Sequence, residues 1–204
     1  MIQLEVLVEE PSAEEALRHL LPKLVRGRAR VKVVNLGSKY KLLGVLNDRL
    51  TAYKARIGKG ENLRIAILVD RDDDDCGELK LKLETAASVA GLPSKSHPDP
   101  LGRIIVLNRI VIEELESWFI GDPPALRAAF PKLPAISENS GIFRNPDNGG
   151  TWEALHRFLR KHGIYRSSYP KIDAARKIAP HLDIDKNRSA SFRHFRTGIE
   201  ALLA

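Results

Sequence analysis

An apolar run that ends in a cluster of aspartates constrains the fold of this chain more than any other feature. Residues Leu63–Val69 have the composition of a buried strand, and Asp70–Asp75 supply five carboxylates directly after it. Because side chains alternate along extended backbone, Asp70, Asp72 and Asp74 are predicted to share one side. Carboxylates this crowded need a cation, a basic partner or full solvation. Converging oxygens suit Mg²⁺ or Mn²⁺, whereas a solvated turn that caps the next helix is the alternative.

Strands alternate with helices along the first 120 residues. Apolar periodicity predicts strands at 2–8, 31–34, 63–69 and 104–112, the last of them bulged or interrupted. Helices are predicted to begin at Ser12, Ser38, Cys76 and Glu113. This order indicates an α/β fold with a mostly parallel sheet flanked by helices, whose ligands bind beyond the carboxyl ends of the strands. Glu9 and Asp70 both follow such ends.

The sequence changes character after Asp122-Pro123-Pro124. A long polar loop is expected from Pro131 to Gly150, with a turn at Gly149-Gly150. Short helices are predicted near 125–130, 151–162, 171–180 and 189–203. We therefore expect residues 1–122 to form the core and residues 123–204 to form a helical extension packed on it.

Charge is spread unevenly along the chain. The net charge is +7, yet residues 21–64 alone carry +10 and residues 151–204 carry +6, so the remainder is acidic. A basic protein with one acidic focus can attract a polyanion and hold a metal ion against a phosphate, although solvated helix faces explain many lysines equally well. The candidates for nucleic-acid phosphate contact are Lys39, Lys41, Arg188, Arg193 and Arg196.

Cysteine usage and hydropathy favour a cytoplasmic protein. The single cysteine, Cys76, excludes an internal disulfide, fits a reducing compartment and is expected to be a small buried helix residue. No apolar run approaches a membrane-spanning length, and the first residues open a strand rather than a signal peptide. One cysteine and six histidines without ligand spacing argue against zinc.

Three acidic segments in order resemble a known group of domains. Val8-Glu9-Glu10-Pro11 resembles the first-strand glutamate motif of Toprim domains, the metal-binding module shared by topoisomerases, primases, recombination proteins and some nucleases. Asp70-Arg71-Asp72 resembles their paired-aspartate motif, and Asp74 resembles a further acid that some members carry. Ile112–Phe119, ending at Asp122, resembles a third motif of the bacterial Toprim-like family called domain of unknown function 4276.

The tail of the chain extends this resemblance to nearly the whole length. Lys171–Ala175, Ile178–Pro180 and Asn187–Phe192 are similar to segments of the same family. The resemblance implies a Toprim-like (Rossmann-like) core and Mg²⁺ or Mn²⁺ chemistry on phosphodiesters. It also implies a relation to the Toprim part of overcoming-lysogenization-defect nucleases, in which the nuclease works with an ATPase.

One position departs from the broader Toprim pattern. Many Toprim domains have glycine after the first glutamate, where this chain has Glu10. Glu10 is therefore either an extra acid of the metal site or a sign that this loop approaches its substrate differently. The chain also lacks a tyrosine in a topoisomerase-like context, which argues against topoisomerase activity.

The resemblance assigns roles to individual acids. We expect Asp70 and Asp72 to bind metal, directly or through water, and Glu9 to complete the site or act as general acid or base. Crowding by other acids raises the pKa of a carboxyl such as Glu9, whereas a bound cation lowers it. Asp74 is a further candidate ligand. Arg71 is expected to pair with a neighbouring acid.

The third acidic motif supplies candidates for a second ion. Glu116 is the first choice, and Glu114 is a further candidate ligand through the resemblance. Helical periodicity instead favours Glu113 as the neighbour of Glu116. The alternative is that these acids are solvated first-turn residues of a helix. Trp118 on the same segment is expected to lie in the core.

The predicted function is metal-dependent phosphodiester cleavage of DNA or RNA, in phage defence or repair beside an ATPase partner. The alternative is a non-catalytic nucleic-acid-binding or ATPase-partner module that retains the acidic metal pocket. A haloacid-type phosphohydrolase would also place paired aspartates after a strand. That family, however, typically has threonine or valine where this chain has Asp74.

Overall fold

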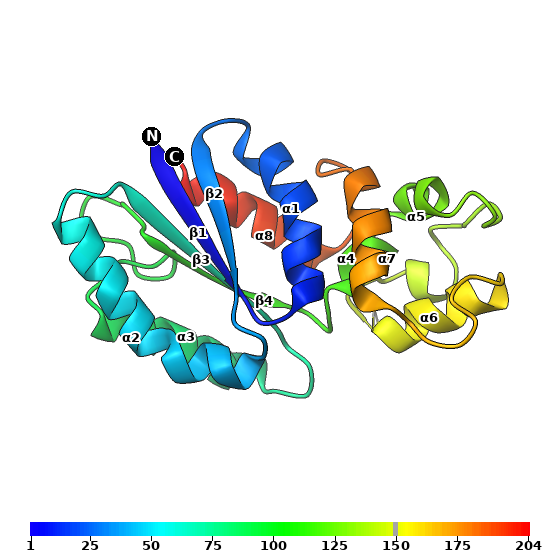
Figure 1. The fold of residues 1–204 in the computed structure, drawn as a ribbon, viewed down its shortest axis with the longest axis horizontal. Coiled ribbons are helices and arrows are strands. Elements are labelled where there is room, and N and C mark those ends of the chain that lie inside the picture. Colours follow the sequence, from blue (N-terminus) through cyan, green and yellow to red (C-terminus); the bar gives the residue numbers. More distant parts are fainter. Residues whose placement is uncertain (149–150) are drawn as a thin grey trace.

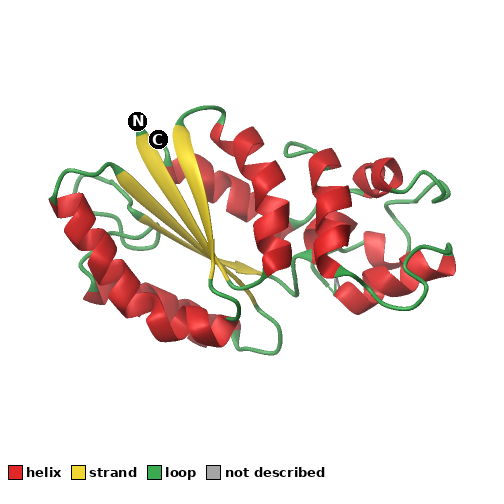
Figure 2. Cartoon of the chain, viewed as in Figure 1, coloured by secondary structure: helices red, strands yellow, loops and turns green. Residues whose placement is uncertain are grey.

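Four parallel strands make up the sheet at the centre of the molecule. The computed structural model describes residues 1–148 and 151–204, and the turn expected at Gly149-Gly150 lies outside them. Within the described residues the sheet order is β2-β1-β3-β4, and every neighbouring pair runs in parallel. The strands are β1 (Ile2–Val8), β2 (Ala29–Asn35), β3 (Leu63–Asp70) and β4 (Val106–Val111). The predicted α/β fold class is confirmed, and the carboxyl ends of all four strands meet at one edge (Figure 2).

Helices cover both faces of this sheet (Figure 1). The crossover helices are α1 (Pro11–Val25), α2 (Lys39–Gly58) and α3 (Cys76–Val89). Leu4 and Val6 of β1 face α1 in one apolar cluster, while Ile65 and Ile67 of β3 face α2 and α3 in another. Burial on both sides explains why β3 is apolar along almost its whole length, while the central strand β1 also carries Gln3 and the buried Glu5.

The C-terminal part of the chain packs back onto the sheet layer. Its helices are α4 (Glu116–Ile120), α5 (Pro123–Ala129), α6 (Trp152–Lys161), α7 (Lys171–Ile178) and α8 (Ala190–Leu202), with 3₁₀ turns at Gly141–Phe143 and Ala179–His181. Helix α7 packs on α1, and α8 packs beside β4. Trp118 is fully buried, as predicted, and contacts the rings of Phe192 and Phe195. The domain boundary at residue 122 stays a prediction.

Local conformations differ from the sequence expectations at a few points. β4 is one unbroken strand from Val106 to Val111. The helix expected at Glu113 begins at Glu116, because Glu113 has a left-handed φ of +60° that ends regular structure there. Cys76, expected in the core, is exposed at the first turn of α3. None of the helices within the described residues is both long and apolar enough to cross a membrane.

Candidate functional site

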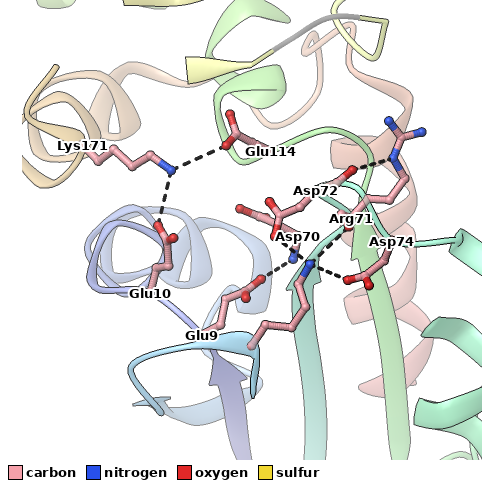
Figure 3. A network of polar contacts seen from close by, with 9 residues as sticks. Glu9, Glu10, Asp70, Arg71, Asp72, Asp74, Glu114 and Lys171 are labelled. Carbon is pink, nitrogen blue, oxygen red and sulfur yellow. Dashed lines mark hydrogen bonds and ion pairs between the residues drawn. The ribbon is translucent and has the colours of Figure 1, made fainter. Parts of the chain in front are cut away.

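Two acids meet where the adjacent strands β1 and β3 end. The register pairs Leu7 with Ile67, so Glu9 and Asp70 leave the sheet at the same edge. The Glu9 carboxylate accepts a hydrogen bond of 2.5 Å from the backbone N–H of Asp70 (Figure 3). Glu9 is only 6% exposed, and this burial raises its pKa to about 7. The first two acidic motifs therefore lie side by side.

The Asp70 carboxyl lies among other acids. Burial raises its pKa well above the ordinary value, and the charges of Glu9 and Glu116 raise it further. Glu116 opens α4, is 2% exposed and has its pKa raised to about 7 by burial. Its Oε1 atom has no hydrogen-bond partner among the described residues. Three predicted site acids, from three separate segments, thus form one electrostatically coupled cluster.

The aspartate run after β3 folds back instead of continuing as a strand. Asp72 has a left-handed φ of +48°, so the alternation expected for Asp70, Asp72 and Asp74 is wrong beyond Asp70. The Lys39 ammonium donates hydrogen bonds to Asp72 Oδ2 at 2.6 Å and to Asp74 Oδ2 at 2.8 Å. It also donates to the Arg71 carbonyl at 3.1 Å. Lys39 was predicted to contact phosphate. In the structure it instead binds the loop of residues 71–74, called the acidic loop below.

Residues 113 and 114 make separate contacts beside the cluster. Arg71 pairs with Glu113 at 2.6 Å, which confirms the expected pairing of Arg71 with an acid. The Glu114 carboxylate accepts a hydrogen bond of 2.6 Å from the Trp152 N–H at the start of α6. Burial raises the pKa of Glu114.

A lysine from α7 reaches the same edge of the sheet. Lys171 Nζ lies 3.6 Å from both Glu10 Oε2 and Glu114 Oε1 (Figure 3). Burial alone would lower its pKa, but the charges of Glu116, Glu10 and Glu114 outweigh burial and raise it. Lys171 was missing from the candidate residues inferred from sequence. Its only signal there was its place in the tail segment that resembles the family.

The three arginines predicted to bind phosphate make contacts away from the acidic cluster. Arg188 donates to the carbonyls of Glu138 and Phe143, and Arg193 donates to the Arg188 carbonyl. Arg196 pairs with Asp185 and Glu200. Lys41, the remaining candidate, is exposed on the first turn of α2.

No preformed metal site is evident. Among residues 1–148 and 151–204, no group of three or more Asp, Glu, His or Cys side chains is arranged to hold an ion. The cluster nevertheless contains carboxylate oxygens alone, the donor type that Mg²⁺ and Mn²⁺ take. The unpartnered Glu116 Oε1 is a buried acceptor of this kind. The donor chemistry of the site therefore fits a hard divalent ion.

The four-stranded all-parallel sheet, flanked by helices and ending in an acidic edge, defines an α/β protein. The chain belongs to the family described as Domain of unknown function (DUF4276), whose model matches residues 8–200. This finding confirms the family inferred from the sequence motifs. A comparison with curated proteins gave no match.

Solved structures resemble the chain over its full length. The C-terminal region of the Burkholderia pseudomallei OLD protein matches with a TM-score of 0.50 and 16% identity, covering 100% of each chain. The C-terminal region of the Xanthomonas campestris pv. campestris OLD protein matches with a TM-score of 0.47 and 18% identity, over 98% of this chain and 95% of that one. At these identities the Burkholderia match establishes a likeness of fold alone.

Proposed function

We propose that this chain cleaves phosphodiester bonds of nucleic acid with Mg²⁺ or Mn²⁺ held at the acidic edge of its sheet. The observation that carries the proposal is the hydrogen bond between the Glu9 carboxylate and the Asp70 N–H. It brings the first two acidic motifs together at the carboxyl end of parallel strands, where ligands of such sheets bind. Family membership and the OLD-like fold support the same reading.

Glu9, Asp70 and Glu116 are the residues that would hold the ion. Burial raises the pKa of each carboxyl, and the charges of neighbouring acids raise it further, so the bare cluster carries an electrostatic cost. A bound divalent ion would offset that cost and withdraw charge from the phosphate oxygens during cleavage. Asp72 and Asp74 would have to leave Lys39, and Glu114 would have to leave Trp152, before joining as further ligands.

The chain's own side chains supply proton transfer and positive charge. Burial raises the pKa of Glu9 to about 7 in the absence of an ion, and a bound cation would lower it, so Glu9 would serve as general acid or base only where it does not itself bind the ion. Lys171 flanks the carboxylates from α7, so its ammonium group can contact a substrate phosphate, whereas Lys39 would first have to release Asp72 or Asp74. We further propose that the protein works in the cytoplasm with an ATPase partner, in phage defence or repair.

Cleavage assays with plasmid and single-stranded substrates test this proposal. The wild-type protein should cut in Mn²⁺ or Mg²⁺ and stop in EDTA, while Asp70→Asn and Glu9→Gln should cut about 100-fold more slowly or not at all. Asp73→Asn is the matched control, because it removes one charge from the same exposed loop outside the proposed ligand set. Circular dichroism verifies that each variant folds. Equal cutting by Asp70→Asn and wild type would contradict the assignment.

A non-catalytic nucleic-acid-binding or ATPase-partner module is the second candidate. The observation that favours it is Lys39, whose ammonium already neutralises Asp72 and Asp74. This candidate predicts nucleic-acid binding that survives Asp70→Asn, with no metal-dependent cleavage by the wild type in the presence or absence of an ATPase partner.

A further inference from the structure

One aromatic side chain differs from all others in the described residues. Tyr40 is 87% exposed, whereas every other tyrosine, phenylalanine and tryptophan there is buried or half-buried. Aromatic rings contribute to folding mainly through the surface they bury, so a ring held in water adds little to stability. Single exposed apolar groups are common on protein surfaces, so exposure alone does not indicate that Tyr40 binds a ligand. Its surroundings do.

Tyr40 lies on the first turn of α2, at the same end of the helix as Lys39. It follows Lys39, whose ammonium binds Asp72 and Asp74. Consecutive Cα atoms lie about 3.8 Å apart, so the ring is attached one residue from a side chain that reaches into the site. Successive side chains of a helix point about 100° apart, so a nucleic-acid strand would have to pass over the first turn of α2 to reach both the ring and the acidic edge.

The surface around Tyr40 is an open groove whose lining includes both apolar and charged side chains. The groove has a volume of about 740 Å³ and runs along the outer face of α2 past Gly44 and Val45. A side chain at Gly44 would meet nothing within 4 Å, so the groove is unobstructed there. Lys41, Arg49 and Asp48 line it, so its basic side chains outnumber its acidic one, and residues 21–64 as a whole carry a net charge of +10. This charge complements a polyanion.

We infer that Tyr40 stacks on an unpaired nucleobase while Lys41 contacts the neighbouring phosphate, leading a single strand toward the acidic edge. The inference rests on the proposed function and adds its substrate class, which is single-stranded nucleic acid or a single-stranded end. An exposed ring can stack on a free base face, which a continuous duplex does not offer because its bases are stacked on one another.

Fluorescence anisotropy in EDTA tests the stacking without any cleavage. The probes are a labelled deoxythymidine oligonucleotide, an abasic oligonucleotide of the same length and charge, and a duplex. The wild type should bind the deoxythymidine strand more tightly than the other two probes. Tyr40→Ala should weaken binding of the deoxythymidine strand about tenfold and leave the abasic strand unchanged. Tyr40→Phe should retain the preference, and Lys41→Ala should weaken both single strands equally.

Equal binding of the deoxythymidine and abasic strands by the wild type would overturn the inference, as would wild-type affinity in Tyr40→Ala. Tighter binding of the duplex would overturn it as well. These outcomes do not depend on whether the protein is a nuclease, because the measurement is made in EDTA and records binding without cleavage. A Tyr40-dependent preference in a protein that never cuts would support stacking and contradict catalysis.

Discussion

The Lys39 ammonium hydrogen-bonds Asp72 at 2.6 Å and so ties the start of α2 to the loop that follows β3. Asp72 adopts a left-handed backbone conformation, which costs free energy for a residue other than glycine. Its carboxylate is also surrounded by like charges. A charge-assisted hydrogen bond from Lys39 offsets both costs, so this lysine supports the acidic loop together with the Arg71–Glu113 ion pair.

Lys39→Met should loosen that loop. The Asp72 side chain is 50% exposed, so the ion pair is partly screened and its loss should lower the free energy of unfolding by about 1 kcal/mol or less. The larger effect should be faster hydrogen exchange at the amides of residues 72–74. Lys41→Met is the control, since Lys41 is exposed one half-turn away. Unchanged exchange in Lys39→Met would show that another contact holds the loop.

Glu84 should make the free energy of unfolding fall as the pH becomes acidic. Burial would raise its pKa, but hydrogen bonds from Lys80 and Ser94 outweigh burial and lower the pKa to about 2. A folded-state pKa below the unfolded value of 4.5 means that the stabilisation is complete above about pH 4.5 and is lost as pH falls toward 2.

Glu84→Gln should therefore lower the free energy of unfolding by about 3 kcal/mol at neutral pH, with the deficit shrinking toward pH 2. Urea denaturation across this pH range measures the difference. Glu78→Gln, at an exposed position on the same helix, should change little. A deficit that is constant with pH would refute the electrostatic explanation and point to packing.

Ionisation of Glu116 should lower the free energy of unfolding, whereas ionisation of Glu84 raises it. Its folded-state pKa of about 7 lies above the ordinary 4.5, so its burial costs stability increasingly as pH rises from 4.5 to 7, and fully above that. In EDTA, Glu116→Gln should raise the free energy of unfolding by about 3 kcal/mol near pH 8 and have little effect near pH 4. A less stable Gln variant at pH 8 would mean that the carboxylate is satisfied in the folded protein.

The position of the site could be predicted from sequence, since it depends on strand order and strand ends. The apolar runs before Glu9 and Asp70 identify parallel strands, and parallel strands in one sheet deliver their following residues to the same edge. The Ser38 cap of α2 was also predictable, because its hydroxyl accepts from the Lys41 N–H in the usual capping pattern.

The local details could not be predicted, because they depend on contacts between distant segments. Left-handed conformations at Asp72 and Glu113 follow no periodicity, so the alternation and the helix start inferred around them were wrong. Lys171 joins the acidic edge only through the packing of α7 on α1. No pattern within the tail alone indicates that contact.

The most direct test of the central claim, that Glu9 and Asp70 belong to one cation-binding pocket, is anomalous diffraction from crystals soaked in Mn²⁺. We predict a peak between the two carboxylates, within direct coordination distance of an oxygen of each. The same soak of Asp70→Asn should lose the peak. A wild-type map with no peak there, or with manganese bound only at the exposed Asp73, would contradict the account.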